Sequence, residues 1–102
     1  MTVLELKSLM DQGTTPFLLD VREPFELEIC QIPGALSIPI NDLPTRMGEI
    51  PQTVAVVVFC RSGGRSQNAV DYLSDHGYTL AVNLDGGILA WSRDIDPSMP
   101  TY

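Results

Sequence analysis

The stretch TVAVVVFCRSGGRS, residues 53–66, determines how the rest of the chain is interpreted. Five of its first seven residues are β-branched, which favours a strand over residues 53–59. Both faces of this strand would be apolar, as is typical of a central strand in a parallel sheet that helices cover on both sides. A turn with two glycines follows, and residues 66–76 have the apolar spacing of a helix that ends at Gly77.

The remaining segments alternate between the patterns of helices and strands. Thr2 and Glu5 have the spacing of a capping box, which predicts a first helix that runs to about Gln12. Further strands are expected at residues 17–21, 36–38 and 80–84, shorter helices at 24–29, 41–47 and around 88–91, and an irregular tail from about Asp94. Strands that alternate with helices in this way predict one α/β domain over residues 1–102, with a parallel sheet and helices on both of its faces.

Composition and charge exclude several functional classes. The chain has 13 Asp and Glu against 6 Lys and Arg, and the net charge of −7 argues against a surface that binds nucleic acid or an anionic membrane. No apolar segment is long enough to cross a membrane and no secretory signal pattern is present, so we expect the protein in the cytoplasm. Cys30, Cys60 and the single His76 make neither a disulfide scaffold nor a zinc site, and we expect no metal.

The chemistry expected of this chain lies in residues 60–65, called here the Cys60 loop. In parallel sheets, chemistry collects at the carboxyl ends of the strands. Cys60 is expected there, directly before a helix whose first N–H groups lack partners inside the helix. The helix terminus and the guanidinium groups of Arg61 and Arg65 should lower the pKa of the Cys60 thiol, and both arginines suit a tetrahedral anion such as thiosulfate or phosphate.

The other residues of this segment complete an anion site in the same interpretation. Gly63 and Gly64 let successive backbone N–H groups surround an oxyanion. Ser62 is expected either to orient a bound anion or to be an ordinary turn residue, and Ser66 to begin the helix with its hydroxyl facing the site. The alternative is an inert buried cysteine followed by a solvated turn. The glycines, the arginines and the helix start together favour the functional interpretation.

Asp20 and Arg22 are candidate supporting residues. They lie where the strand over residues 17–21 ends, and are therefore expected near Cys60. We favour a salt-bridged corner that fixes the neighbouring loops over a direct contact with substrate.

Four short motifs follow one another along the chain: Asp20-Val21-Arg22-Glu23, Ile32-Pro33-Gly34-Ala35, residues 60–66, and Gly86-Gly87-Ile88 with Ala90-Trp91. Through these motifs the chain resembles the rhodanese family of sulfurtransferases over nearly its whole length. The resemblance implies a three-layer α/β sandwich with a central five-stranded parallel sheet. It also implies that Cys60 is a catalytic cysteine that alternates between a thiol and a persulfide.

The reaction that the resemblance implies moves one sulfur atom. The Cys60 thiolate would attack the sulfane sulfur of a small donor such as thiosulfate, and the persulfide would pass that sulfur to cyanide or a thiol, without a metal or an organic cofactor. Four residues separate Cys60 from Arg65. The related dual-specificity phosphatases and arsenate reductases have a loop that is longer by one residue, so the shorter loop favours attack at sulfur over attack on a phosphate ester.

Two further interpretations concern the acceptor. Residues 94–102 resemble the tails of rhodanese domains fused to adenylating enzymes, which implies a persulfide donor to a ubiquitin-like sulfur-carrier protein in molybdopterin, thiamine or cysteine synthesis. A non-catalytic rhodanese-like interaction module is a third interpretation, against which the presence of Cys60 argues. The chain has Cys30-Gln31-Ile32 where the family usually has Gly-His-Ile. We expect Cys30 to be a bystander rather than a resolving thiol.

Overall fold

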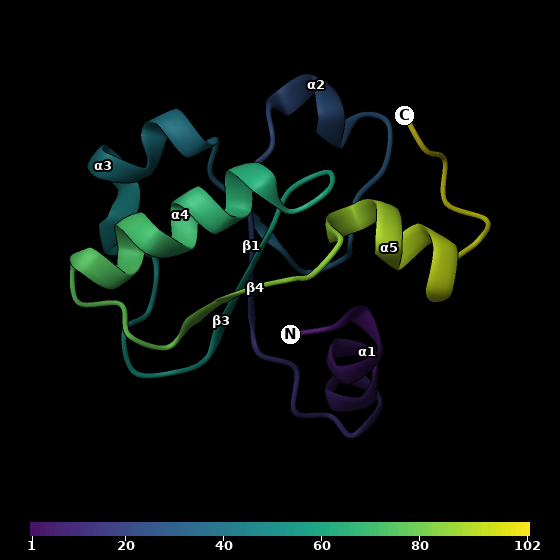
Figure 1. Ribbon diagram of the computed structural model, residues 1–102, viewed down its shortest axis with the longest axis horizontal. Helices are drawn as coiled ribbons and strands as arrows, with labels where there is room; N and C mark the ends of the chain where they lie inside the picture. The colour runs from purple at the N-terminus through teal and green to yellow at the C-terminus, as the bar shows by residue number, and fades with distance from the viewer.

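The computed structural model describes residues 1–102 and has a parallel sheet between two groups of helices (Figure 1). The strands are β1 (Phe17–Asp20), β2 (Leu36–Ser37), β3 (Val56–Phe59) and β4 (Ala81–Asn83). The α-helices are α1 (Val3–Asp11), α2 (Pro24–Leu27), α3 (Leu43–Arg46), α4 (Gly64–Asp75) and α5 (Gly87–Asp94), and the short 3₁₀ helices η1 (Ile40–Asp42) and η2 (Met47–Glu49) flank α3. The predicted α/β class and the order of its elements are confirmed.

The sheet has four strands in the order β2-β1-β3-β4, and all neighbouring strands are parallel. The expected five-stranded sheet is therefore wrong in its number of strands. The four apolar runs that the residues themselves predict as strands are the four strands present, and the remaining segments are helical or irregular. β3 begins at Val56 and not at Thr53. Pro16 has no N–H group, so pairing with β1 starts at Phe17, whose N–H donates to the carbonyl of Ala55 at 3.0 Å.

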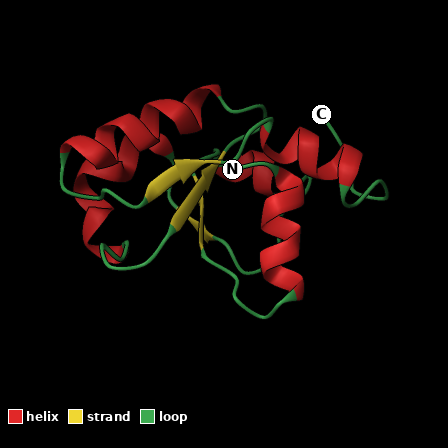
Figure 2. Cartoon of the chain, turned by 60° about the horizontal axis from the view of Figure 1, so that its bottom comes forward, coloured by secondary structure: helices red, strands yellow, loops and turns green.

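β3 lies at the centre of the sheet and contributes to two separate cores. Val56, Val58 and the following Cys60 pack on the side of α3 and α4. Val57 and Phe59 pack on the opposite side, with apolar residues of α1 and α5. All five residues are at most 1% exposed. Figure 2 shows the helices on both sides of the strands, and the prediction of a central strand covered on both faces is confirmed.

The helix starts follow local sequence signals. The capping box at α1 is present, because Thr2 Oγ1 accepts from the Glu5 N–H and Glu5 Oε1 accepts from the Thr2 N–H, both at 3.1 Å. α4 begins at Gly64, two residues earlier than the predicted Ser66. Gly63 has a φ of 111°, a left-handed conformation that lets the chain turn from β3 directly into the helix. None of the helices combines the length and the apolar character needed to span a membrane.

Candidate active site

The sulfur of Cys60 lies directly after β3 and accepts hydrogen bonds from the start of α4. The N–H groups of Gly63 and Ser66 donate to Sγ, at 3.1 and 3.4 Å, and Ser66 Oγ lies 3.3 Å from Sγ. The Ser66 N–H belongs to the first helical turn, where N–H groups have no partner inside the helix. The sulfur therefore lies where an anion binds at a helix start.

These hydrogen bonds shift the protonation equilibrium of Cys60. Burial raises the pKa of the thiol, but the Ser66 hydroxyl, when it donates to the sulfur, and the N–H groups of Ser66, Gly63 and Ser62 lower it by more. The pKa of Cys60 thus lies below its ordinary value, and the loop stabilises the thiolate, which is the nucleophilic form of cysteine. The direction agrees with the prediction from sequence, whereas the cause is hydrogen bonding more than the charge of the arginines.

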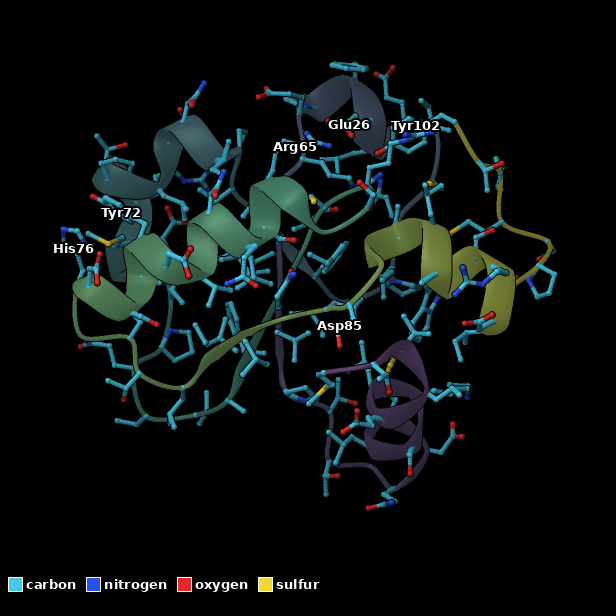
Figure 3. The ribbon with its side chains drawn as sticks, in the orientation of Figure 1. Glu26, Arg65, Tyr72, His76, Asp85 and Tyr102 are labelled. Carbon is cyan, nitrogen blue, oxygen red and sulfur yellow. The ribbon has the colours of Figure 1, made fainter.

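Arg65, in the first turn of α4, forms an ion pair with Glu26 of α2 (Figure 3). Its Nη1 and Nη2 donate to the two carboxylate oxygens, at 2.6 and 2.9 Å. These hydrogen bonds lower the pKa of Glu26 to about 2, although burial acts in the opposite direction. Arg65, which was expected to bind an anionic substrate, thus has a carboxylate partner within the protein.

Arg61 is exposed and contacts Tyr102 in the tail. Its Nε donates to the main-chain oxygen of Tyr102 at 2.6 Å, Nη2 donates to the same oxygen, and the guanidinium lies 5.1 Å from the centre of the Tyr102 ring. The Tyr102 hydroxyl donates to Glu26 and accepts from Nη1 of Arg22 at 3.2 Å. Tyr102 therefore connects the Cys60 loop to α2 and to the end of β1, as Figure 3 shows for Tyr102, Glu26 and Arg65.

Asp20 and Arg22 form a buried ion pair at the end of β1. Nη2 and Nε of Arg22 donate to the Asp20 carboxylate, at 2.8 and 3.0 Å, and Arg22 is 0% exposed. The same guanidinium donates to the main-chain oxygens of Glu26 and Cys30, at 3.3 and 2.8 Å. The salt bridge favoured from sequence is present, and it holds together the segments around α2 and Cys30.

Asn83, at the end of β4, holds two residues beside the Cys60 sulfur. Ser66 Oγ donates to Asn83 Oδ1 at 2.6 Å. Nδ2 of Asn83 donates to the main-chain oxygen of Gly63 at 3.2 Å. Asn83 thus fixes both residues whose N–H groups donate to the sulfur.

Gly87 brings the start of α5 against the Cys60 loop. The N–H groups of Ile88 and Leu89 donate to the main-chain oxygens of Cys60 and Arg61, at 2.9 and 3.0 Å. A Cβ atom on Gly87 would lie 2.6 Å from both of these oxygens, and the φ of 59° at this residue is left-handed. Only glycine combines this conformation with so close an approach.

The remaining candidate residues take different positions. Ser62 and Gly64 are exposed on the outer side of the loop. Both cysteines are free, and they belong to the two separate cores, Cys60 on the side of α4 and Cys30 on the side of α1 and α5. Cys30 Sγ lies 3.8 Å from Nη1 of Arg22. No three His, Cys, Asp or Glu side chains are grouped closely enough to hold a metal ion.

Sequence reasoning missed three residues of this site: Glu26, Asn83 and Tyr102. Glu26 carries a weak signal, because it has capping-box spacing from Glu23, and that capping box is present at α2. Asn83 and Tyr102 carry none, since their partners Ser66 and Arg61 are 17 and 41 residues away in the chain.

Comparison with known proteins identifies the family. Residues 2–94 match the family described as the rhodanese-like domain. The chain belongs to the rhodanese-like family. This rhodanese-like protein is 49% identical over 76 residues to a sulfurtransferase of Allochromatium vinosum, which covers 74% of this chain and 71% of that protein.

A second relative is a longer protein. The rhodanese-like chain is 37% identical over 108 residues to the adenylyltransferase and sulfurtransferase MOCS3-1 of Zea mays, a match that covers 99% of this chain and 23% of that protein. The chain thus spans about a quarter of the length of that relative.

A solved structure has the same fold. The human single-domain sulfurtransferase TSTD1 superposes with a TM-score of 0.79 at 30% identity, covering 92% of this chain and 95% of that one. The family, the relatives and the fold together support sulfur transfer as the class of activity of this rhodanese-like protein.

Proposed function

We propose that this rhodanese-like protein transfers a sulfane sulfur from a small anionic donor such as thiosulfate, through a persulfide on Cys60, to cyanide or a thiol. One observation carries the proposal: the N–H groups of Gly63 and Ser66 donate to the Cys60 sulfur at 3.1 and 3.4 Å. Fixed donors of this kind stabilise the thiolate before attack and negative charge that develops near the same position afterwards.

The reaction consists of two displacements at sulfur. The Cys60 thiolate attacks the outer sulfur of thiosulfate, a bond between the two sulfurs forms, and the donor's own sulfur–sulfur bond breaks, so that its electron pair leaves with sulfite. Cyanide or a thiolate then attacks the terminal sulfur of the persulfide and leaves as thiocyanate or a new persulfide, which restores the Cys60 thiolate. No general base is needed during attack, because the hydrogen bonds of the loop stabilise the thiolate in advance.

The exposed side of the Cys60 loop receives the donor in this proposal. Arg61, Ser62 and Gly64 are exposed there, whereas Cys60 is buried. The guanidinium of Arg61 donates to a main-chain oxygen of Tyr102. An oxygen of thiosulfate can take the place of that acceptor, and because Arg61 is exposed, the exchange leaves no buried charge unpaired. Arg65 keeps its ion pair with Glu26, and its positive charge acts on the donor from within the Cys60 loop.

Mass spectrometry after incubation with thiosulfate, without reducing agent, tests the proposal. We expect an adduct of about 32 Da, the mass of one sulfur atom, on the wild type and on Cys30→Ala but not on Cys60→Ala. We also expect thiocyanate from thiosulfate and cyanide, and no hydrolysis of an aryl phosphate by the same sample. An adduct that persists in Cys60→Ala, or phosphate release without thiocyanate, would contradict the proposal. Absence of any adduct would favour a non-catalytic interaction module.

A second candidate function is sulfur donation to a ubiquitin-like sulfur-carrier protein in molybdopterin, thiamine or cysteine synthesis. The match of 99% of this chain to part of a protein named adenylyltransferase and sulfurtransferase favours it. The Cys60 chemistry is the same, and only the acceptor differs. Protein loaded with radioactively labelled sulfur, incubated with such a carrier protein and its adenylating enzyme, should label the carrier. Label that moves to cyanide and thiols alone would exclude this second candidate.

A further inference from the structure

Asn83 controls the direction in which the Ser66 hydroxyl donates its proton. The hydroxyl has one proton and two neighbours, Asn83 Oδ1 at 2.6 Å and Cys60 Sγ at 3.3 Å. The amide orientation of Asn83 is fixed by its second hydrogen bond, from Nδ2 to the main-chain oxygen of Gly63. An oxygen atom therefore faces Ser66, and the short distance assigns the hydroxyl proton to Asn83.

This arrangement has opposite consequences for the two protonation states of Cys60. While Ser66 donates to Asn83, its oxygen can only accept from the Cys60 S–H group, which stabilises the thiol. When Cys60 loses its proton to solvent, the hydroxyl stabilises the thiolate only by turning toward Sγ, and this turn breaks its bond with Asn83. Asn83 and Cys60 thus compete for one proton of Ser66.

We propose that Asn83 is a positioning residue that limits the thiolate fraction of Cys60 by holding the hydroxyl proton of Ser66. The hydroxyl is released to the sulfur only as negative charge develops there. This role of Asn83 rests on the proposed function, in which the Cys60 thiolate is the attacking group of the first displacement. The proton of Ser66 is never lost in this step, because it changes its acceptor and not its oxygen.

The charged groups around Cys60 are kept constant in the test of this proposal. They are Arg61 of the loop, Arg65 of α4 with its partner Glu26 of α2, the Asp20–Arg22 pair at the end of β1, and the Tyr102 phenol of the tail. The residues of β4 and α5 that bond to Cys60 or to its neighbours in the site, Asn83, Ile88 and Leu89, carry no charge. A substitution of Asn83 by an uncharged residue therefore changes hydrogen bonds and leaves every one of these charges in place.

The direct measurement is the titration of Cys60 in the 102-residue chain, followed by the chemical shift of its β-carbon. In Asn83→Ala the freed hydroxyl donates to the sulfur. At a pH well below the midpoint of the Cys60 titration, we expect the thiolate fraction to rise about three- to tenfold, the factor that one typical hydrogen bond provides. In a Ser66→Ala background the same substitution should leave the thiolate fraction unchanged, because no hydroxyl proton remains to be redirected. The comparison of the two backgrounds isolates the part of the effect that acts through Ser66.

Three results would overturn the inference: no change on Asn83→Ala, a smaller thiolate fraction, or an equal change in both backgrounds. The last result would mean that Asn83 acts only by fixing Gly63. If Asn83→Ala does not fold, Asn83→Leu removes the same hydrogen bonds while filling the space of the side chain, and the same comparison applies. The titration is independent of sulfur transfer. A missing sulfur adduct on Cys60 would thus count against the proposed function, while the titration alone decides the role of Asn83.

Discussion

Both terminal nitrogens of Arg65 donate to Glu26, a residue 39 positions earlier in the chain, at 2.6 and 2.9 Å. This fork-to-fork ion pair fastens the start of α4 to α2 and places a carboxylate beside the loop that was expected to be cationic. The charge of the site is therefore set by residues outside the Cys60 loop as well as by those inside it.

Replacing Glu26 should improve the binding of an anionic donor. In Glu26→Gln the Arg65 guanidinium loses its charged partner, and we expect the KM for thiosulfate to fall about threefold or more because a repelling charge is gone. Steady-state thiocyanate formation measures this change. Glu49→Gln, which removes the exposed partner of Arg46, is the matched control and should leave KM unchanged. An unchanged or higher KM in Glu26→Gln would show that the Glu26 carboxylate does not oppose binding of the donor.

The same ion pair should make stability depend on pH. Glu26 has a pKa of about 2 in the folded protein against an ordinary 4.5, so the folded state binds its proton less readily than the unfolded state. The contribution of the ionised Glu26 to the free energy of unfolding is therefore complete above about pH 4.5 and is lost as the pH falls toward 2. Urea unfolding of the wild type and Glu26→Gln should differ by about 2 kcal/mol at pH 7, and this difference should shrink between pH 4.5 and 2. If the difference in unfolding free energy between the two proteins does not change between pH 4.5 and 2, the lowered pKa of Glu26 is wrong.

The buried corner at Arg22 should contribute far more stability than an exposed ion pair. Arg22→Ala leaves the Asp20 carboxylate buried without a cation, and we expect a loss of about 3–5 kcal/mol in the free energy of unfolding. Arg46→Ala removes the partner of Glu49 at the surface and should cost less than about 1 kcal/mol. Denaturant unfolding compares the two variants, and equal losses would refute the structural role of the corner.

Gly87→Ala should disturb the site through the main chain. The new methyl group would overlap the main-chain oxygens of Cys60 and Arg61, in a left-handed conformation that alanine adopts poorly. We expect a stability loss of about 2–4 kcal/mol and a fall in sulfur transfer of about a hundredfold, because the loop must move. Gly48→Ala meets no atom within 4 Å and should change neither quantity appreciably. Equal behaviour of the two variants would refute this role of Gly87.

Cys30 should be dispensable for turnover. It lies in the core on the side of α1 and α5, opposite the core that contains Cys60, and contacts Arg22. Cys30→Ala should lose about 1 kcal/mol of stability and keep both the sulfur adduct and thiocyanate formation. A folded Cys30→Ala or Cys30→Ser protein without turnover would make Cys30 a resolving thiol instead.

The features that sequence analysis predicted well are local ones. The β-branched run over residues 53–59 specifies a buried strand by its own composition, and the two glycines with the following helix pattern specify the turn and the position of Cys60. The predicted helix start at Ser66 is two residues too late, because the left-handed Gly63 shortens the turn and α4 begins at Gly64. The fifth strand was expected from resemblance alone and had no apolar run of its own to support it.

The partners of the loop could not be predicted in the same way. Glu26, Asn83 and Tyr102 reach Arg65, Ser66 and Arg61 across 39, 17 and 41 residues, and only the folded chain brings them together. A polar residue near a strand end also satisfies many structural roles, so its type alone does not identify its neighbour. The charge of the site and the position of its hydroxyl proton therefore depend on tertiary contacts and cannot be read from the loop sequence alone.

The contacts around Cys60 come from segments made at very different times during synthesis. Asn83 and the turn at Gly87 are added to the chain more than 20 residues after Cys60, and Tyr102 is added later than both. Until β4 and α5 have packed, the hydrogen bonds of Asn83 with Ser66 and Gly63 are missing, as are those from α5 to the main-chain oxygens of Cys60 and Arg61. Only local bonds, such as that from the Gln67 N–H to the Gly63 oxygen, then hold the loop. Cys60 therefore reaches its final environment, with Ser66 bonded to Asn83, only after the segments that follow it have folded, and its reactivity in a nascent or damaged chain differs from that in the native protein.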